Sequence, residues 1–320
     1  MSLAIIVTTN EGNVLAADSM ETYRNAIGDI RMGSENRMKL FQLNRKVGAL
    51  ACGISFLENK NIQQHIHNFK TQYDLESMEV TEVVDKLYDF FADIYSKFLT
   101  NCAEGHKKRF EEKGCKDVKY TFNLECINLE YKDEHGKKQE QKLYQSILEF
   151  LVCGHDTHGV NHVYKITLPD PKEKNGVVLK LNKEQSGATW IGQTDVLIRI
   201  IRGWSPEIKR LPIIQDLPPN KKDELLRQID DQEYVVNWGT MTLQDAIEFS
   251  ELAVKITESI QKITDGTWSL PGSSPGVGGP IDVAVVTPEK GFHWIQKKKL
   301  HINDSIVDLD ETESKVHHRR

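Results

Sequence analysis

The sequence predicts an α+β protein in which two packed sheets lie between layers of helices. Hairpin and helix patterns follow one another along the chain as two hairpins, two helices, a hairpin, two helices and a final hairpin. In addition, the first two predicted strands are apolar on both faces, which is typical of a sheet covered on each side. We therefore expect a layer above and a layer below each sheet.

The N-terminal stretch SLAIIVTTNEGNVLAADS predicts a β-hairpin. Two apolar runs flank the polar NEGN segment, where Asn and Gly supply the backbone conformations that a tight turn requires. This pairing brings Ser2 to the level of Asp18. A second strand pair is expected at residues 39–43 and 47–52, on either side of the polar NRK turn.

The remaining elements follow from periodicity and capping signals. Apolar residues predict a long helix from Val80 to Phe98, preceded by a weaker helical pattern over residues 56–69. The stretch TDVLIRIIRG predicts a short helix, SGATWIG a strand end, and ILEFLVCGHDTHGVNHVYKITL and IDVAVVTPEKGFHWI two further hairpins. Thr242 opens the last helix with a capping box, and its expected inward face comprises Ala246, Phe249, Ala253, Ile256, Ile260 and Ile263.

Composition limits the function. The chain has 320 residues and a formal net charge of −6, which argues against a nucleic-acid partner because such modules usually carry a basic excess. No apolar run is long enough to span a membrane, and the N-terminus lacks a secretory signal pattern. Five cysteines without paired zinc spacing fit a reducing compartment. We expect a soluble cytoplasmic protein without a membrane partner.

Residues 1–303 are expected to form a single domain with two surface insertions. The first, at about residues 102–145, is rich in charge and Gly around one strand-like piece, VKYTFNLECINLEY. The second, at about residues 204–240, carries four prolines and a charged run. The polar residues 304–320 are interpreted as a solvated tail.

The segment CGHDTHGVNH invites a metal-site interpretation through its cysteine and three histidines. Its place in a hairpin turn favours an exposed loop instead, so no metal and no cofactor are expected. The residues concerned are Cys153, His155, His158 and His162.

Four separated stretches carry a resemblance to a known family. They are AIIVTTNEGNVLAADS, MKLFQL, VGALACG and GGPIDVAVVTPEKG. In order and spacing they resemble the proteasome β-subunit family, which includes the bacterial heat-shock peptidase. The resemblance implies a four-layer αββα sandwich of the N-terminal-nucleophile hydrolase type, here with two surface insertions.

The resemblance also implies a set of site residues. Ser2, exposed by removal of Met1, matches the family's N-terminal nucleophile, and Asp18 lies sixteen positions later, as the family aspartate does. Lys39 matches the family lysine and lies fourteen positions before Gly53, which matches the glycine whose N–H stabilises the oxyanion.

The chemistry of this set needs no histidine. A free α-amine has a pKa of roughly 7.7 to 8.0, so it can accept the hydroxyl proton of its own residue directly or through water. The Lys39 charge, held beside Asp18, would keep that amine neutral. By resemblance, Thr22 and Ser55 bind substrate, and Ala51 lies at the base of the specificity pocket.

Around these residues the sequence departs from the family. Serine replaces the usual threonine nucleophile and lacks the β-methyl that restricts its rotamer. Gln193, Ser274 and Val277 stand where the family has supporting polar groups, although Asp265 could enter if the loop is rebuilt. We expect an altered set of supporting contacts around the nucleophile.

Three functions remain after these observations. The first is a proteasome-like peptidase acting on peptide or unfolded protein, which the family implies to be a homo-oligomeric ring that can be fed by an ATP-dependent unfoldase. The second is a small-molecule amidase of the same fold, for which the altered surroundings and the insertions are the discriminating signs. The third is a non-catalytic ring subunit, which requires that Met1 be retained. The sequence favours the first.

Overall fold

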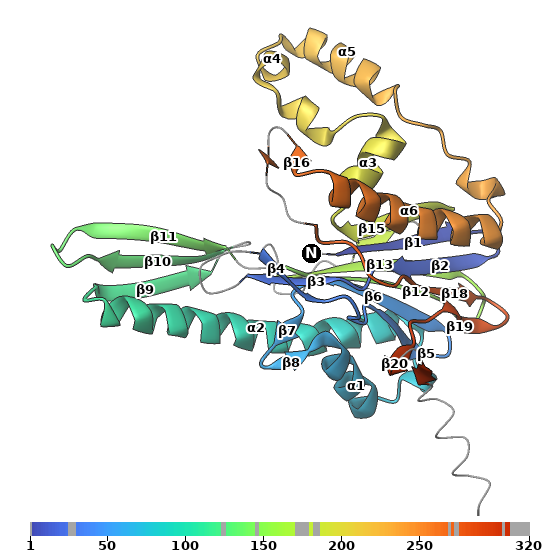
Figure 1. The fold of residues 1–320 in the computed structure, drawn as a ribbon, viewed down its shortest axis with the longest axis horizontal. Coiled ribbons are helices and arrows are strands. Elements are labelled where there is room, and N and C mark those ends of the chain that lie inside the picture. Colours follow the sequence, from blue (N-terminus) through green and yellow to red (C-terminus); the bar gives the residue numbers. More distant parts are fainter. Residues whose placement is uncertain are drawn as a thin grey trace, which may run out of the picture.

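The computed structural model in Figure 1 shows a mixed α/β protein with several sheets. It describes residues 2–24, 30–122, 126–144, 147–169, 179–181, 186–267, 270–271, 275–302 and 305–307. Two five-stranded sheets form its centre.

The first central sheet is antiparallel and has the order β15-β1-β2-β18-β19. Its N-terminal hairpin is the predicted one, with Ala4 opposite Ala17. The turn of that hairpin needs Gly12, where a Cβ would lie 2.7 Å from the Val286 carbonyl oxygen. The strands are β1 (Leu3–Thr9), β2 (Gly12–Ala17), β15 (Gly187–Gly192), β18 (Asp282–Thr287) and β19 (Gly291–Gln296).

The second central sheet has the order β14-β13-β12-β6-β5 and is also antiparallel. Both strand pairs expected from the sequence are present in it. Its strands are β5 (Leu40–Asn44), β6 (Val47–Gly53), β12 (Leu148–His155), β13 (Asn161–Leu168) and β14 (Leu179–Leu181).

The two sheets face each other across a buried apolar core. Leu15 from the first sheet, and Leu50 and Leu151 from the second, belong to one cluster and are fully buried. Alternate residues of β1 point away from this core, so both faces of the strand are covered, as its apolar pattern predicts.

Helices cover the outer face of each sheet (Figure 1). Helices α1 (Ile62–Gln72) and α2 (Val80–Glu112) pack on the second sheet in a cluster that includes Phe91 and Phe150. Helices α3 (Asp195–Arg202) and α6 (Leu243–Ile263) pack on the first sheet, where Val254 is fully buried. The predicted capping box of α6 is present, and Gly203 ends α3 with a φ of 72°.

Several elements lie outside this centre. The C-terminal part of α2 lies beside a three-stranded sheet, and together they project from the two central sheets (Figure 1). Helices α4 and α5 lie on the far side of α3 from the first sheet (Figure 1). This small sheet comprises β9 (Lys116–Phe122), β10 (Cys126–Lys132) and β11 (Lys138–Tyr144); the helices are α4 (Pro212–Gln215) and α5 (Pro219–Asp230).

The shorter elements are β3 (Glu21–Arg24), β4 (Ile30–Ser34), β7 (Phe56–Leu57), β8 (Lys60–Asn61), β16 (Gly266–Thr267), β17 (Leu270–Pro271), β20 (Leu300–Ile302) and β21 (Ser305–Val307), with 3₁₀ turns at Leu75–Ser77, Pro206–Arg210 and Trp238–Thr240. Within the described part of the chain, no helix has both the length and the apolarity needed to cross a membrane.

Three local predictions are wrong. Residues 56–61 form a two-stranded hairpin rather than the start of a helix, because the turn at Glu58 and Asn59 has positive φ angles of 46° and 63°. The piece VKYTFNLECINLEY contributes two strands instead of one. On α6, Ala246 and Ala253 are buried as predicted, but Ile260 and Ile263 are exposed, and the rest of the buried face consists of Ser250, Val254 and Thr257.

Candidate functional site

A buried ion pair lies where the N-terminal hairpin meets the second sheet. The Lys39 ammonium donates to Asp18 Oδ1 at 2.7 Å and to the Met20 carbonyl oxygen at 2.6 Å. The side chain of Asp18 is 0% exposed and that of Lys39 is 6% exposed. Burial of both partners makes their geometry important, because either charge left alone would be strongly destabilising.

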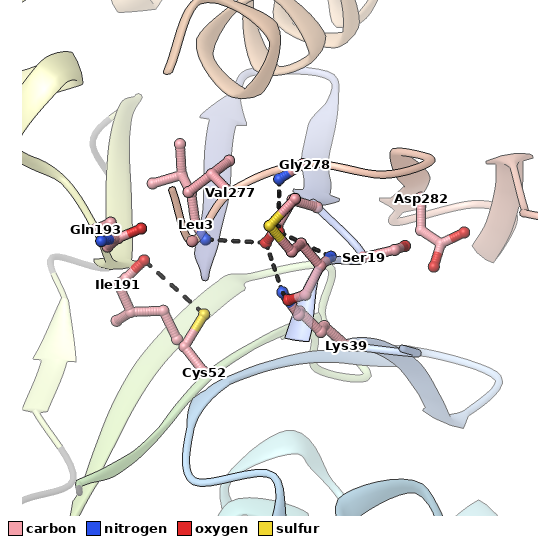
Figure 2. A network of polar contacts seen from close by, with 12 residues as sticks. Leu3, Ser19, Lys39, Cys52, Ile191, Gln193, Val277, Gly278 and Asp282 are labelled. Atoms are coloured by element: carbon pink, nitrogen blue, oxygen red, sulfur yellow. Dashed lines mark hydrogen bonds and ion pairs between the residues drawn. The ribbon is translucent and has the colours of Figure 1, made fainter. Parts of the chain in front are cut away.

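Backbone N–H groups from three segments hold Asp18 in place. Leu3 donates to Oδ1 at 3.0 Å, while Met20 and Gly278 donate to Oδ2 at 3.0 and 3.1 Å. Figure 2 shows Leu3, Lys39 and Gly278 on different ribbons, and each of them donates to the Asp18 carboxylate. Asp18 therefore joins the first strand, the start of β5 and the loop before β18 at one point.

Ser2 lies at the inner end of β1 and is 5% exposed. Its carbonyl oxygen accepts from the Gln193 N–H at 2.6 Å. Gly192 permits this approach, because a Cβ at that position would lie 2.0 Å from the same carbonyl oxygen. The hydrogen bond from Gln193, the residue after β15, therefore fixes the main chain of Ser2 against the sheet.

Five of the seven residues expected in the site line one small cavity of about 20 Å³. That volume is enough for about one water molecule. Arg37, which is not among the residues expected in the site, also lines the cavity. The predicted residues that line it are Ser2, Lys39, Ala51, Gly53 and Ser55.

Gly53 ends β6 in a conformation that only glycine adopts readily. Its φ is 104°, and a Cβ there would lie 1.9 Å from the Ile147 carbonyl oxygen. That oxygen accepts from the Ile54 N–H at 2.9 Å. The close approach explains why the chain has a glycine at this wall of the cavity.

Cys52 also lines the cavity and carries a potentially nucleophilic group. Burial raises the pKa of its thiol to about 12, with Lys39 lowering it and Asp18 raising it by smaller amounts. The thiol consequently stays protonated at neutral pH, and a thiol is a far weaker nucleophile than a thiolate. Its sulfur lies 3.9 Å from the Ile191 carbonyl oxygen.

The remaining two predicted residues take different positions. Asp18 lies behind Lys39, and Thr22 lies on β3, opposite Met32 of β4, outside the residues that line the cavity. The residue before Thr22, Glu21, forms a short ion pair with Arg37. Thr22 is therefore connected to the cavity through its neighbour rather than directly.

Gln193 and Val277, two of the positions singled out in the sequence, are connected through Gln261. The Gln261 amide nitrogen donates to Gln193 Oε1 at 3.1 Å, and its oxygen accepts from the N–H groups of Gly276 and Val277. Val277 is fully buried, and Asp265 is exposed just beyond α6. Ser274 lies outside the described residues.

A second lysine–aspartate pair lies beside the first. Lys298 forms a short ion pair with Asp282 and donates to Ser19 Oγ at 2.8 Å. Its backbone N–H donates to Asp282 Oδ1 at 2.8 Å. Burial lowers the pKa of Lys298, and Asp282 opposes this effect.

The histidine-rich turn differs from the predicted exposed loop. His158 is exposed, but His155 and His162 are 5% and 7% exposed, and the Nδ1 atoms of both have no hydrogen-bond partner among the residues that the structure describes. His162 Nε2 lies 3.0 Å from Asp156 Oδ2. Within the described ranges, no group of His, Cys, Asp and Glu has an arrangement suited to a metal ion.

Two kinds of residue escaped the sequence reasoning. Arg37 had a usable signal, because it lies two positions before Lys39 and so faces the same way in an extended segment. Asp282 and Lys298 had no such signal, since their relation to Ser19 depends on a contact between residues 279 positions apart.

No protein-family model matches the chain, and no curated protein matches it. Among solved structures, the chain is similar to one described as an Anbu (Gly-1) mutant from Hyphomicrobium sp. strain MC1. The alignment covers 95% of this chain and 89% of that chain, at 12% sequence identity and a TM-score of 0.45. This similarity says nothing about the activity of the chain.

Proposed function

We propose that the chain is an N-terminal-nucleophile hydrolase that cleaves peptide bonds with Ser2 after removal of Met1. In this proposal the two sheets and their covering helices are the αββα sandwich of that type. The observation that carries the proposal is the shared cavity of Ser2, Lys39 and Gly53, with Asp18 bound directly to Lys39.

The α-amine of Ser2 serves as the general base in this mechanism. It takes the proton of the Ser2 hydroxyl, directly or through one water, while the oxygen attacks the substrate carbonyl. The cavity volume fits one such water. Lys39 supplies a positive charge that favours the neutral amine, and Asp18 holds that charge in place.

The developing oxyanion is stabilised by the backbone N–H of Gly53. Removal of one such donor usually costs about 2.7 to 4 kcal/mol of transition-state stabilisation. Collapse of the intermediate breaks the C–N bond, and the leaving amine takes the proton that the Ser2 α-amine had accepted. An ester remains on Ser2, which water then hydrolyses. Cys52 does not compete as nucleophile because its thiol remains protonated.

Substrate contacts in this proposal come from Ala51, Ser55 and Thr22. Ala51 and Ser55 line the cavity, and Thr22 on β3 binds the substrate backbone as an added strand. A peptide has to widen the cavity as it enters, since the volume is far below that of ordinary ligand pockets.

A fluorogenic-peptide panel tests the activity. Ser2→Ala should lose roughly 1,000-fold in kcat/KM, and Lys39→Ala should lose a comparable amount. The matched controls are Ser77→Ala and Lys97→Ala, because both residues are exposed and neither lines the cavity. Mass spectrometry of each preparation first establishes that Ser2 is the first residue.

The outcomes separate the three candidate functions. Peptide cleavage that Ser2→Ala abolishes supports the peptidase. Cleavage of small acyl amides alone points to an amidase of the same fold. A retained Met1 in protein from its natural source, with neither activity, contradicts catalysis and leaves a non-catalytic subunit.

The proposal also includes a homo-oligomeric ring in the cytoplasm, fed by an ATP-dependent unfoldase. Its support on the surface is three exposed apolar side chains on α6, namely Leu252 at 58%, Ile260 at 37% and Ile263 at 78% exposed. Exposed apolar side chains that form a patch mark protein contacts.

A further inference from the structure

The pair Asp282–Lys298 is also largely shielded from solvent, although less completely than the pair Asp18–Lys39. Its side chains are 1% and 9% exposed, and Lys298 donates to Ser19, which is fully buried. The proposed mechanism gives these two charges no role. Buried ionic groups of this kind are costly to desolvate, so their position calls for an explanation.

Strand register places the second pair on the same face of the sheet as Ser2. Asp282 is opposite Ala17, which is opposite Ala4 in β1. Ala4, Ala17 and Ala284 all belong to the core between the sheets. Because side chains alternate along a strand, Ser2 and Asp282 point to this same side of the sheet.

Ser19 links the second pair to the first. It follows Asp18 directly, its N–H donates to the Gly278 carbonyl oxygen at 2.9 Å, and its own carbonyl oxygen accepts from the Arg37 N–H at 2.9 Å. Figure 2 shows Ser19 beside this cluster, with Asp282 on its other side. The charges of Lys39 and Asp18 both act on the pKa of Lys298, which fits this proximity.

We propose that Asp282 and Lys298 are positioning residues that fix the segment carrying Asp18 and, as a charge-balanced pair, keep the protonation of the Ser2 α-amine under the control of Lys39. The inference rests on the proposed function in giving that amine its role as base. A cation near an amine favours the neutral form, and an anion favours the protonated form. As a balanced pair, Lys298 and Asp282 leave the amine under the influence of Lys39.

Other titratable and charged groups lie on the elements around Ser2, and the experiment has to hold them constant. They come from the strands on both sides of the core and from the segment before β5. They are Asp18, Lys39, Cys52, the pair Arg37–Glu21 and the pair Glu149–Lys165.

The test measures the pKa of the amine itself. Full-length protein with Ser2 as the first residue, released from a fusion by a protease that leaves no extra residue, is labelled with trace acetic anhydride across a pH series. Mass spectrometry of the N-terminal peptide gives the neutral fraction of the amine. No catalysis is needed for this readout.

Opposite shifts are expected for the two single variants. Lys298→Met leaves the Asp282 charge alone and should raise the amine pKa by about 0.5 to 1 unit, whereas Asp282→Asn should lower it by a similar amount. In the double variant the amine pKa should return toward the wild-type value. Lys298→Arg, which keeps the positive charge, should have the wild-type amine pKa. Lys97→Met, at an exposed pair, is the control for a charge change.

The outcomes distinguish this inference from the proposed function. Amine pKa values that do not differ among the folded variants beyond the error of the titration overturn the inference, even where the wild type cleaves peptides. Opposite shifts in a protein without hydrolytic activity support the electrostatic inference and reject the proposed function. Near-UV circular dichroism checks folding, and if Lys298→Met does not fold, Lys298→Gln and Asp282→Asn decide.

Discussion

The Lys39 ammonium lies 2.7 Å from Asp18 Oδ1, and neither side chain has appreciable contact with solvent. Three backbone N–H groups complete the surroundings of this carboxylate. The pair therefore ties together the first strand, the start of β5 and the loop before β18. A change at either residue should alter both folding and chemistry.

Asp18→Asn should destabilise the protein by about 3 to 5 kcal/mol, because it leaves the Lys39 ammonium buried without its counter-charge. Peptide hydrolysis should fall at least 100-fold, since the charge that favours the neutral amine loses its anchor. Urea unfolding and the fluorogenic assay measure the two effects. Asp93→Asn, which breaks an exposed pair with Lys97, is the control and should leave both unchanged; equal effects of the two variants would contradict the prediction.

Gly53→Ala should destabilise the fold by about 3 kcal/mol or more, because its Cβ collides with the Ile147 carbonyl oxygen at a positive φ. Gly105 offers the matched comparison inside α2, where no atom of the described residues, apart from the helix's own nearby backbone, lies within 4 Å of an added Cβ. Gly105→Ala should stabilise the protein by roughly 0.5 to 1 kcal/mol. Thermal unfolding of the two variants should give shifts of opposite sign, and a neutral Gly53→Ala would refute the steric argument.

The strand pairs and the capping box of α6 could be predicted from the sequence, because hairpin and capping signals are local. The meeting of Ser2, Lys39 and Gly53 at one cavity is expected only through the resemblance to a known family. The inward face of α6 could not be predicted, since periodicity does not say which of two apolar stripes meets the sheet. Burial of His155 likewise depends on the tertiary packing of a turn that is locally polar. The pair Asp282–Lys298 depends on where the chain goes after β19.

His155 should make stability depend on pH. Burial lowers its pKa below the ordinary value of 6.5. His155 is therefore protonated more readily in the unfolded chain than in the folded protein. The free energy of unfolding keeps its full value above about pH 6.5 and decreases as the pH falls toward and through the pKa of the folded state. His155→Gln should flatten this slope by up to about 1.4 kcal/mol per pH unit, measured by urea unfolding between about pH 7 and 5.

The exposed His158 in the same turn provides the control, and His158→Gln should keep the wild-type slope. Asp156 titrates in a separate range, because its contacts with His162 and backbone N–H groups outweigh burial and lower its pKa to about 2. A slope that survives His155→Gln would assign the effect to another group.

The exposed apolar side chains of α6 should matter for assembly. Ile263→Asp and Leu252→Asp should shift the sedimentation profile toward smaller species by at least one step, because a charge at a buried contact is costly. Ile213 on α4 is equally exposed, at 76%, and Ile213→Asp is the control. An unchanged profile in both α6 variants would exclude this helix face as the contact.

A Cβ at Gly192 would collide with the Ser2 carbonyl oxygen, and a Cβ at Gly53 would collide with the Ile147 carbonyl oxygen. Because both oxygens belong to the backbone, no side-chain rotamer change can relieve these collisions. In distant relatives, both positions should therefore remain glycine even where the neighbouring apolar residues have been substituted by other apolar residues. Retention of this pair at matching strand ends would therefore help to recognise remote relatives whose overall identity has faded.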